Sequence, residues 1–224
     1  MGSNVVLCIA PHPDDETLGC GGTLLKHKNA GDKVHWFIAT AVSVAAGFSA
    51  ERVQKRADEI ARVAKEYGFD GVHQAGFPTA QLDRVPKSDL VGALADVVKQ
   101  IQPNVLYVPY RNDVHSDHAA VFDAAMACTK SFRYPSVKSV YTYETLSETE
   151  FGLRPDDPGF RPNLFVDISP WLDKKIDLMK MFEGEMGEFP FPRSETSLRA
   201  LAALRGGTAG CGAAEGFMIL KEVR

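Results

Sequence analysis

The sequence has no long apolar segment and little cysteine. No stretch approaches the roughly 18 consecutive apolar residues of a membrane-spanning helix, and the first apolar run ends at Pro11 with no basic region before it. The four cysteines lie far apart and form no Cys-x-x-Cys pair, so reduced thiols are expected instead of disulfides. These absences argue against a membrane partner and a secretory signal, and we expect a cytoplasmic protein.

Positive charge is not in excess either. Lys and Arg number 25 and Asp and Glu number 29, which gives a formal net charge of −4. Such a chain has no general attraction to a phosphate backbone, so we expect no nucleic-acid partner. Internal repeats and low-complexity tracts are also missing, and a length of 224 residues suits a single domain spanning 1–224.

Short apolar runs alternate along the chain with segments of helical periodicity. Alternation of this kind, with continuous apolar strands, is typical of a mostly parallel α/β sheet covered by helices on both faces. In such sheets ligands bind at the carboxyl ends of the strands, where the loops diverge. The predicted strands are 4–10, 33–40, 71–76, 104–109, 139–145 and 163–168, and the predicted helices are 17–31, 49–69, 88–102, 169–184 and 194–206.

Histidine and carboxylate side chains follow two of these strands, in the segments PHPDDE and YRNDVHSDH. Because the carboxyl ends of parallel strands share one edge of a sheet, we expect the two loops to meet there. His and Asp are ligands for divalent ions of the zinc type, and three protein ligands leave a position open for water. The residues concerned are His12, Asp14, Asp15, Glu16, His115, Asp117 and His118.

Adjacent acids such as Asp14 and Asp15 point in different directions, so one can bind a metal while the other accepts a proton. Zinc lowers the pKa of bound water to roughly 7, and a nearby carboxylate can then act as general base. A histidine near the metal but not bound to it could donate a hydrogen bond to a developing oxyanion. The pattern therefore predicts metal-assisted hydrolysis. Glu16 is interpreted as favouring a helix N-terminus through the helix dipole.

The segments APHPDDETLGCGG and HSDH resemble the two signatures of the PIG-L/LmbE-like N-acetylglucosaminyl deacetylase family. YETLSETEFG, NLFVDIS and the tail PRSETSLRALAALRGGTAGCGAAEGF resemble the bacillithiol-pathway deacetylase branch of that family. The resemblance covers most of the chain. It implies a Rossmann-like fold and an N-deacetylase, an enzyme in which a metal-bound water attacks the amide carbonyl.

The resemblance also implies roles for individual residues. His12, Asp15 and His118 would hold the metal, which is expected to be Zn²⁺, with Fe²⁺ as an alternative. Asp14 would act as general base and then as acid toward the leaving amine.

Four further positions follow from the same resemblance or depart from it. His115 would stabilise the oxyanion, Asp117 would orient a histidine, and Arg56 would contact substrate hydroxyl or phosphate groups. In the segment FPTAQL, Thr79 occupies the place where many members of the family have an aspartate that contacts the sugar. A neutral hydroxyl at this substrate-binding position alters how sugar hydroxyls are recognised.

The predicted function is zinc-dependent removal of an N-acetyl group from a GlcNAc-containing small molecule or glycoconjugate. Two alternatives stay open: hydrolysis of another acylated amino sugar or natural-product intermediate, and a non-catalytic metal- or sugar-binding module. The expected partner is a small-molecule amino sugar, and the expected assembly is a homo-oligomer. Arg193 and Arg205 fit a substrate contact, a subunit contact or an ordinary surface position.

Overall fold

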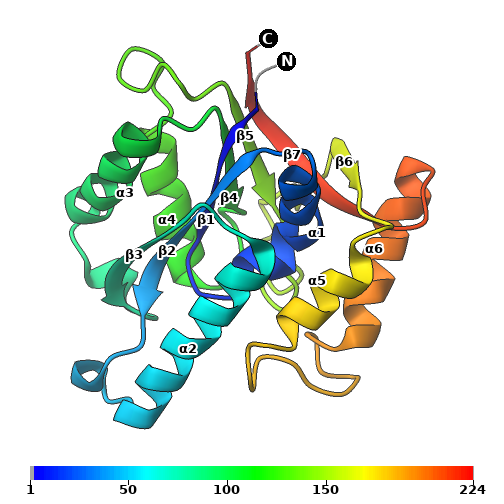
Figure 1. The fold of residues 1–224 in the computed structure, drawn as a ribbon, viewed down its shortest axis with the longest axis horizontal. Helices are drawn as coiled ribbons and strands as arrows, with labels where there is room; N and C mark the ends of the chain where they lie inside the picture. Colours follow the sequence, from blue (N-terminus) through cyan, green and yellow to red (C-terminus); the bar gives the residue numbers. More distant parts are fainter. Residues whose placement is uncertain (1–2, 224) are drawn as a thin grey trace.

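The computed structural model describes residues 3–223, which form a seven-stranded sheet with helices on both faces (Figure 1). The strand order is β3-β2-β1-β4-β5-β7-β6. The strands are β1 Val5–Ala10, β2 Lys33–Ala41, β3 Gly71–Pro78, β4 Val105–Pro109, β5 Ser139–Tyr143, β6 Leu164–Asp167 and β7 Ala214–Glu222. The helices are α1 Asp15–Asn29, α2 Ala50–Tyr67, α3 Lys87–Ile101, α4 Ser116–Ala127, α5 Leu172–Met179 and α6 Glu195–Ala209, with short 3₁₀ turns η1 Val44–Ala46 and η2 Leu82–Arg84.

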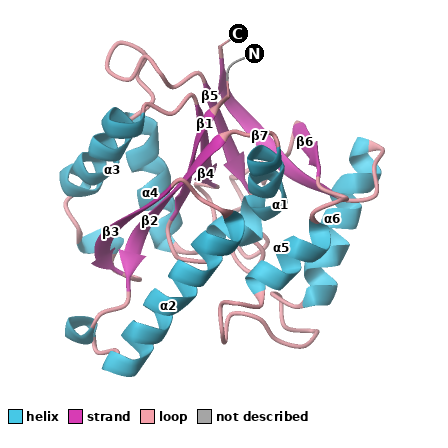
Figure 2. Ribbon diagram, viewed as in Figure 1, coloured by secondary structure: helices cyan, strands magenta, loops and turns pink. Residues whose placement is uncertain are grey.

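Two apolar cores lie on opposite faces of the sheet, and β1 contributes to both. Val6 and Cys8 pack in the core beneath α1, α2 and α5, whereas Leu7 and Ile9 pack in the core beneath α3 and α4. All four side chains are fully buried. This alternation explains why β1 is a continuous apolar run, since both of its faces are covered (Figure 2).

The central strand β1 marks the point where the chain changes direction across the sheet. It pairs in parallel with β2 on one side and with β4 on the other. The loops that follow β1 and β4 therefore leave the same edge of the sheet and diverge, which opens a crevice between them. The α/β fold class and the mostly parallel sheet are confirmed.

The structure differs from the sequence-based expectations in three elements. Helix α4 and strand β7 were not predicted, and β7 pairs antiparallel with both β5 and β6. The inner face of α4 begins with the buried polar residues Asp117 and His118, which interrupt the apolar period. In β7 the buried Glu215 and the adjacent Gly216 have the same effect on the apolar run. Helix α5 is also shorter than the predicted 169–184.

Helix α1 is kinked at Cys20, whose φ and ψ of −141° and 21° are not helical. The Glu215 carboxylate accepts hydrogen bonds from the backbone N–H groups of Gly22 (2.9 Å) and Thr23 (2.7 Å), which the kink leaves without helical partners. Lys175 donates to the Leu18 carbonyl (2.9 Å) and to Glu215 (2.6 Å). A buried ion pair thus holds the helix whose first turn carries the acidic cluster.

Candidate active site

The two predicted loops meet at the carboxyl edge of the sheet. Residues 11–14 connect β1 to α1, and residues 110–115 connect β4 to α4, so each motif ends in the first turn of a helix. Asp14 precedes α1 and His115 precedes α4 as N-cap residues. The tertiary structure therefore brings the members of the acidic and histidine motifs together.

Asp14 has an unusual backbone conformation, with φ at 142°. A non-glycine residue in such a region costs on the order of 1–3 kcal/mol and persists only where its surroundings hold it. The Glu16 side chain accepts a hydrogen bond from the Asp14 N–H (3.0 Å), and Arg56 donates to the carbonyl of Pro13 (3.2 Å). Glu16 is fully buried and also accepts from the Thr17 hydroxyl (2.5 Å), so its side chain secures the loop that presents Asp14.

His12, Asp15 and His118 place one ligand atom each within 4.8 Å of one another. Asp15 Oδ2 lies 3.2 Å from His12 Nδ1 and 3.4 Å from His118 Nε2. His118 Nε2 is buried and makes no hydrogen bond. Because buried polar atoms nearly always have a partner, the lone pair of this nitrogen is expected to bind a ligand. Two imidazoles and a carboxylate converging in this way fit a divalent metal ion.

The other ring nitrogen of His118 is held by Asp113, a residue that the motifs did not single out. His118 Nδ1 lies 2.7 Å from Asp113 Oδ2, and the Thr149 hydroxyl donates to Asp113 Oδ1 at 2.6 Å. Asp113 and His118 are both completely buried. A proton on Nδ1, donated to the carboxylate, leaves the lone pair of Nε2 directed at the candidate metal position.

Most of the acceptor capacity of the Asp117 carboxylate is already in use. Its oxygens accept from the N–H groups of Ala80 (2.8 Å) and Leu82 (3.0 Å), and Oδ2 also lies 3.1 Å from His12 Nε2. This contact orients the His12 ring with Nδ1 toward Asp15. The alternative grouping of His12, His115 and Asp117 is therefore the poorer donor set.

His115 is held in one tautomer by the helix that it caps. The backbone N–H of Asp117 donates to His115 Nδ1 at 3.1 Å, so in the neutral ring the proton lies on Nε2. Burial lowers the pKa of His115, and the nearby His12 lowers it further. A neutral imidazole that lines the cleft with an N–H is suited to donate to an oxygen that becomes negative.

Arg193, from the segment before α6, contacts the Asp14 carboxylate. Its Nη1 donates to Asp14 Oδ2 (2.9 Å) and to Glu185 Oε2 (3.1 Å), and its Nε donates to the Ser147 hydroxyl (2.7 Å). Glu185 also binds Arg56 and, at 3.4 Å, Arg52. Of the three interpretations of Arg193 left open by the sequence, its position in this cleft favours a site role, whereas Glu185 carried no sequence signal.

Burial and neighbouring charges shift the pKa values in this cluster. Burial raises the pKa of Asp14, the charge of Asp15 raises it further, and Arg193 opposes both, so the value is about 7. Burial lowers the pKa of His12, but its bonds to Asp117 and Asp15 outweigh this and raise the pKa to about 9. The pKa of His118 rises to about 10 because the charge of Asp15 and the bond to Asp113 outweigh its burial. The carboxylates thus concentrate negative charge where a divalent cation would compensate it.

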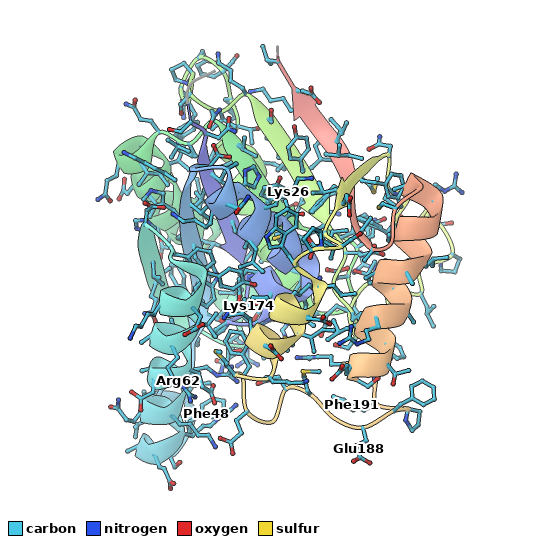
Figure 3. The ribbon with its side chains drawn as sticks, turned by 45° about the vertical axis from the view of Figure 1, so that its right-hand side comes forward. Lys26, Phe48, Arg62, Lys174, Glu188 and Phe191 are labelled. Carbon is cyan, nitrogen blue, oxygen red and sulfur yellow. The ribbon has the colours of Figure 1, made fainter. Side chains whose placement is uncertain are left out.

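A cleft of about 260 Å³ opens onto these groups and contains both predicted substrate-binding positions, Arg56 and Thr79. The Arg56 side chain is 8% exposed and its guanidinium is already paired with Glu185 and Glu59. Apolar side chains from the end of β2 and from the segment after it form part of the wall, namely Ala41, Val42 and Phe48. Phe48, which lines the cleft together with residues of the first motif, lies toward the lower end of the molecule in Figure 3.

Residues 7–129 match the family model described as PIG-L, GlcNAc-PI de-N-acetylase. This segment is more than half of the chain and contains every metal-ligand, catalytic and substrate-binding residue predicted from the sequence. The chain belongs to the PIG-L family. Arg193 and Glu185 lie outside the matched segment.

Relatives of this PIG-L protein include deacetylases of acetylated sugars. The diacetylchitobiose deacetylase of Thermococcus kodakarensis is 27% identical over 236 residues, which cover 97% of this chain and 84% of that protein. The solved structure of the N,N′-diacetylchitobiose deacetylase of Pyrococcus horikoshii superposes with a TM-score of 0.78 at 21% identity, covering 98% of this chain and 84% of that one.

A structure with another activity shares the fold. The 4-carboxy-2-hydroxymuconate hydratase GalB of Pseudomonas putida superposes with a TM-score of 0.72 at 19% identity, covering 99% of this chain and 98% of that one. Fold alone therefore does not decide the reaction. Membership of the PIG-L family confirms the predicted N-deacetylase class, whereas the bacillithiol-pathway branch stays a prediction.

Within residues 3–223 of this PIG-L protein, none of the helices is both long and apolar enough to cross a membrane.

Proposed function

We propose that this protein is a zinc-dependent hydrolase that removes the acetyl group from the 2-acetamido position of a GlcNAc-containing small molecule or glycoconjugate. The main support for the proposal is that one cleft brings together a set of three candidate metal ligands, the Asp14 carboxylate and the neutral His115 imidazole. Metal-assisted hydrolysis of an amide uses these three functions together.

His12, Asp15 and His118 are the residues that would hold the metal. Two imidazoles and one carboxylate suit Zn²⁺ and also accept Fe²⁺. When bound, the ion would supply a Lewis acid that acidifies a water and polarises the amide carbonyl. Asp117 orients His12, and Asp113 orients His118, through the ring nitrogens that face away from the metal.

Asp14 is the general base in this proposal. It takes a proton from the attacking water as the carbon–oxygen bond forms, and it then gives the proton to the amine nitrogen as the carbon–nitrogen bond breaks. Arg193 positions the carboxylate by binding Oδ2, and His115 donates its Nε2 proton in a hydrogen bond to the acyl oxygen as that oxygen gains negative charge.

The substrate side of the site is assigned to Arg56 and Thr79, which line the cleft. Arg56 would reach the substrate from its position beside Glu185, and the Thr79 hydroxyl would contact a sugar hydroxyl. We also propose that 1–224 is a single domain, that the protein works in the cytoplasm on a small-molecule amino sugar, and that it assembles as a homo-oligomer.

The test is acetate release from N-acetylglucosamine derivatives by the zinc-loaded protein. Asp14→Asn is expected to lower kcat by about 10²–10⁴-fold, because the amide cannot take the proton. Zinc affinity measured in parallel separates loss of the base from loss of the metal. Asp123→Asn, on the outer side of α4 beside Arg111, is the matched control and should keep the wild-type rate. An unchanged rate in Asp14→Asn would remove the proposed base.

The second candidate is hydrolysis of another acylated amino sugar or natural-product intermediate. The neutral Thr79 and the apolar wall at Ala41, Val42 and Phe48 favour it, because they suit a substrate with an apolar substituent. This alternative predicts slow turnover of simple N-acetylglucosamine and faster turnover of sugars with apolar aglycones. Equal activity on the two kinds of substrate would count against it. Sugar binding without any acetate release from either kind would instead favour a non-catalytic module.

A further inference from the structure

We propose that a second cavity, at the end of the sheet opposite the active site, binds a small organic anion with an aromatic body. The cavity has a volume of about 550 Å³, compared with about 260 Å³ for the active-site cleft. This volume lies within the usual range for small-molecule sites. The chemistry proposed above uses none of the residues that line it.

The cavity is bounded by the last turns of α1 and by the amino ends of the central strands. Val105 opens β4 and Ser139 opens β5, whereas the catalytic loops follow the last residues of β1 and β4. In Figure 3, Lys26, which lines the cavity, lies in the upper part of the molecule, far from Phe48 at the lower end. Occupation of this cavity therefore leaves the active-site cleft open.

Aromatic side chains form one wall of the cavity. The rings of Tyr107 and Tyr141 lie 5.6 Å apart between centroids and are inclined by 44°. Phe165 and Val166 of β6 continue this apolar surface. Inclined aromatic faces of this kind pack favourably against a planar ring. This wall therefore favours a ligand that contains an aromatic ring.

The two charged side chains that line the cavity are both positive. Lys26 and Lys138 line it together with His27, and the lining residues include no Asp or Glu. Lys26 donates to a backbone carbonyl, that of Asp167, at 3.3 Å. The neighbouring Asp32 carboxylate is bound by His27 Nδ1 at 2.6 Å and by the N–H of Asn4 at 2.7 Å. In a chain with a net charge of −4, this local excess of positive charge favours an anionic ligand.

The experiment uses 8-anilinonaphthalene-1-sulfonate as an aromatic anionic probe, with its uncharged analogue N-phenyl-1-naphthylamine for comparison. Fluorescence titration of the full chain should give one sulfonate per chain, bound at least about tenfold more tightly than the uncharged analogue. Lys26→Glu combined with Lys138→Glu should weaken sulfonate binding at least about tenfold. These substitutions do not touch the catalytic residues, so acetate release should stay unaltered.

The matched control places the same two charge reversals elsewhere on the surface, at Lys65→Glu in α2 and Lys99→Glu in α3, and should leave binding unchanged. Circular dichroism confirms that each variant is folded. Equal loss of binding in the control pair would show a general charge effect and overturn the proposal. Loss of binding in Arg52→Glu at the rim of the active-site cleft, with the cavity variants unaffected, would place the probe in that cleft and overturn it as well. Absence of sulfonate binding together with dissociation of an oligomer on charge reversal would assign the cavity to a second copy of this chain.

Discussion

The two histidines of the second motif differ in what holds their ring nitrogens. His118 is bound through Nδ1 by Asp113, whereas His115 accepts a backbone N–H at Nδ1. The first arrangement leaves a lone pair for a metal, and the second leaves a proton for an acyl oxygen. In the proposed reaction, these two residues of the same type, three positions apart, would therefore have different roles that follow from their hydrogen-bond partners.

Asp113→Asn is expected to weaken zinc binding by about 10–100-fold, because the neutral amide orients His118 less firmly and makes its imidazole less basic. Competition of the apo protein with a chromophoric chelator measures the affinity. Asp123→Asn, which changes a carboxylate of α4 bound to Arg111 and Lys87, is the control and should bind zinc as the wild type does. Equal affinities in the two variants would show that Asp113 does not support the ligand.

Arg193→Gln is expected to lower kcat by about 10²-fold with little change in KM, because the Asp14 carboxylate loses the group that fixes its position. Added guanidinium ion should restore part of the rate, and Arg193→Lys should retain more activity than Arg193→Gln. Arg199→Gln, which removes an exposed arginine of α6, serves as the control. A rise in KM without a fall in kcat would assign Arg193 to substrate binding instead.

At the scale of elements, α6 contains two adjacent glycines in different surroundings. A methyl group at Gly206 would lie 2.7 Å from the carbonyl oxygen of Cys211 and 2.9 Å from the backbone of Ala213, whereas one at Gly207 would meet nothing within 4 Å. The close approach of α6 to the segment that leads into β7 therefore requires glycine at the first position only.

Gly207→Ala is expected to increase the free energy of unfolding by about 0.5–1 kcal/mol, because alanine loses less backbone entropy in a helix. Gly206→Ala is expected to decrease it by about 1–3 kcal/mol, because the backbone must shift. Urea unfolding at equilibrium measures both, and each variant is the control for the other. Similar changes in the two would contradict the close packing.

The elements that were predicted share a clear apolar period. Helix α2 begins at the expected Ser49 cap and ends at Gly68, which has a positive φ of 70°. Helix α4 and strand β7 are not predicted from the sequence, because buried polar residues interrupt the spacing of their apolar residues. Burial of His118 and Glu215 is favoured by polar partners, because Asp113 binds His118 Nδ1 and Lys175 binds the Glu215 carboxylate.

At the scale of the whole molecule, the last strand is tied to the first helix through Glu215. Its carboxylate accepts from Lys175 of α5 and from two backbone N–H groups at the kink of α1. Glu215 and Lys175 are each 5% exposed. This contact connects segments from both ends of the chain and supports the turn that presents Asp14 and Asp15.

Glu215→Ala is expected to lower the free energy of unfolding by about 3–5 kcal/mol, because Lys175 is left buried and unpaired. Adding Lys175→Met should recover only part of the loss, since the N–H groups of Gly22 and Thr23 still lack an acceptor. Urea unfolding of both variants checks this. Full recovery in the double variant would show that the ion pair alone, and not the capping of the kink, stabilises this region.

The alternation of strands and helices as far as β4 can be predicted from the sequence alone, and so can the two motifs at the ends of β1 and β4. Local periodicity and short spacings are enough for these, because the information lies within a few residues. Tertiary structure alone decided that Arg193 lies 2.9 Å from Asp14, that Asp113 holds His118, and that Glu16 secures the loop instead of serving only the helix dipole. Contacts between residues as far apart as Asp14 and Arg193 leave no trace in local spacing, because folding and not chain connectivity brings them together.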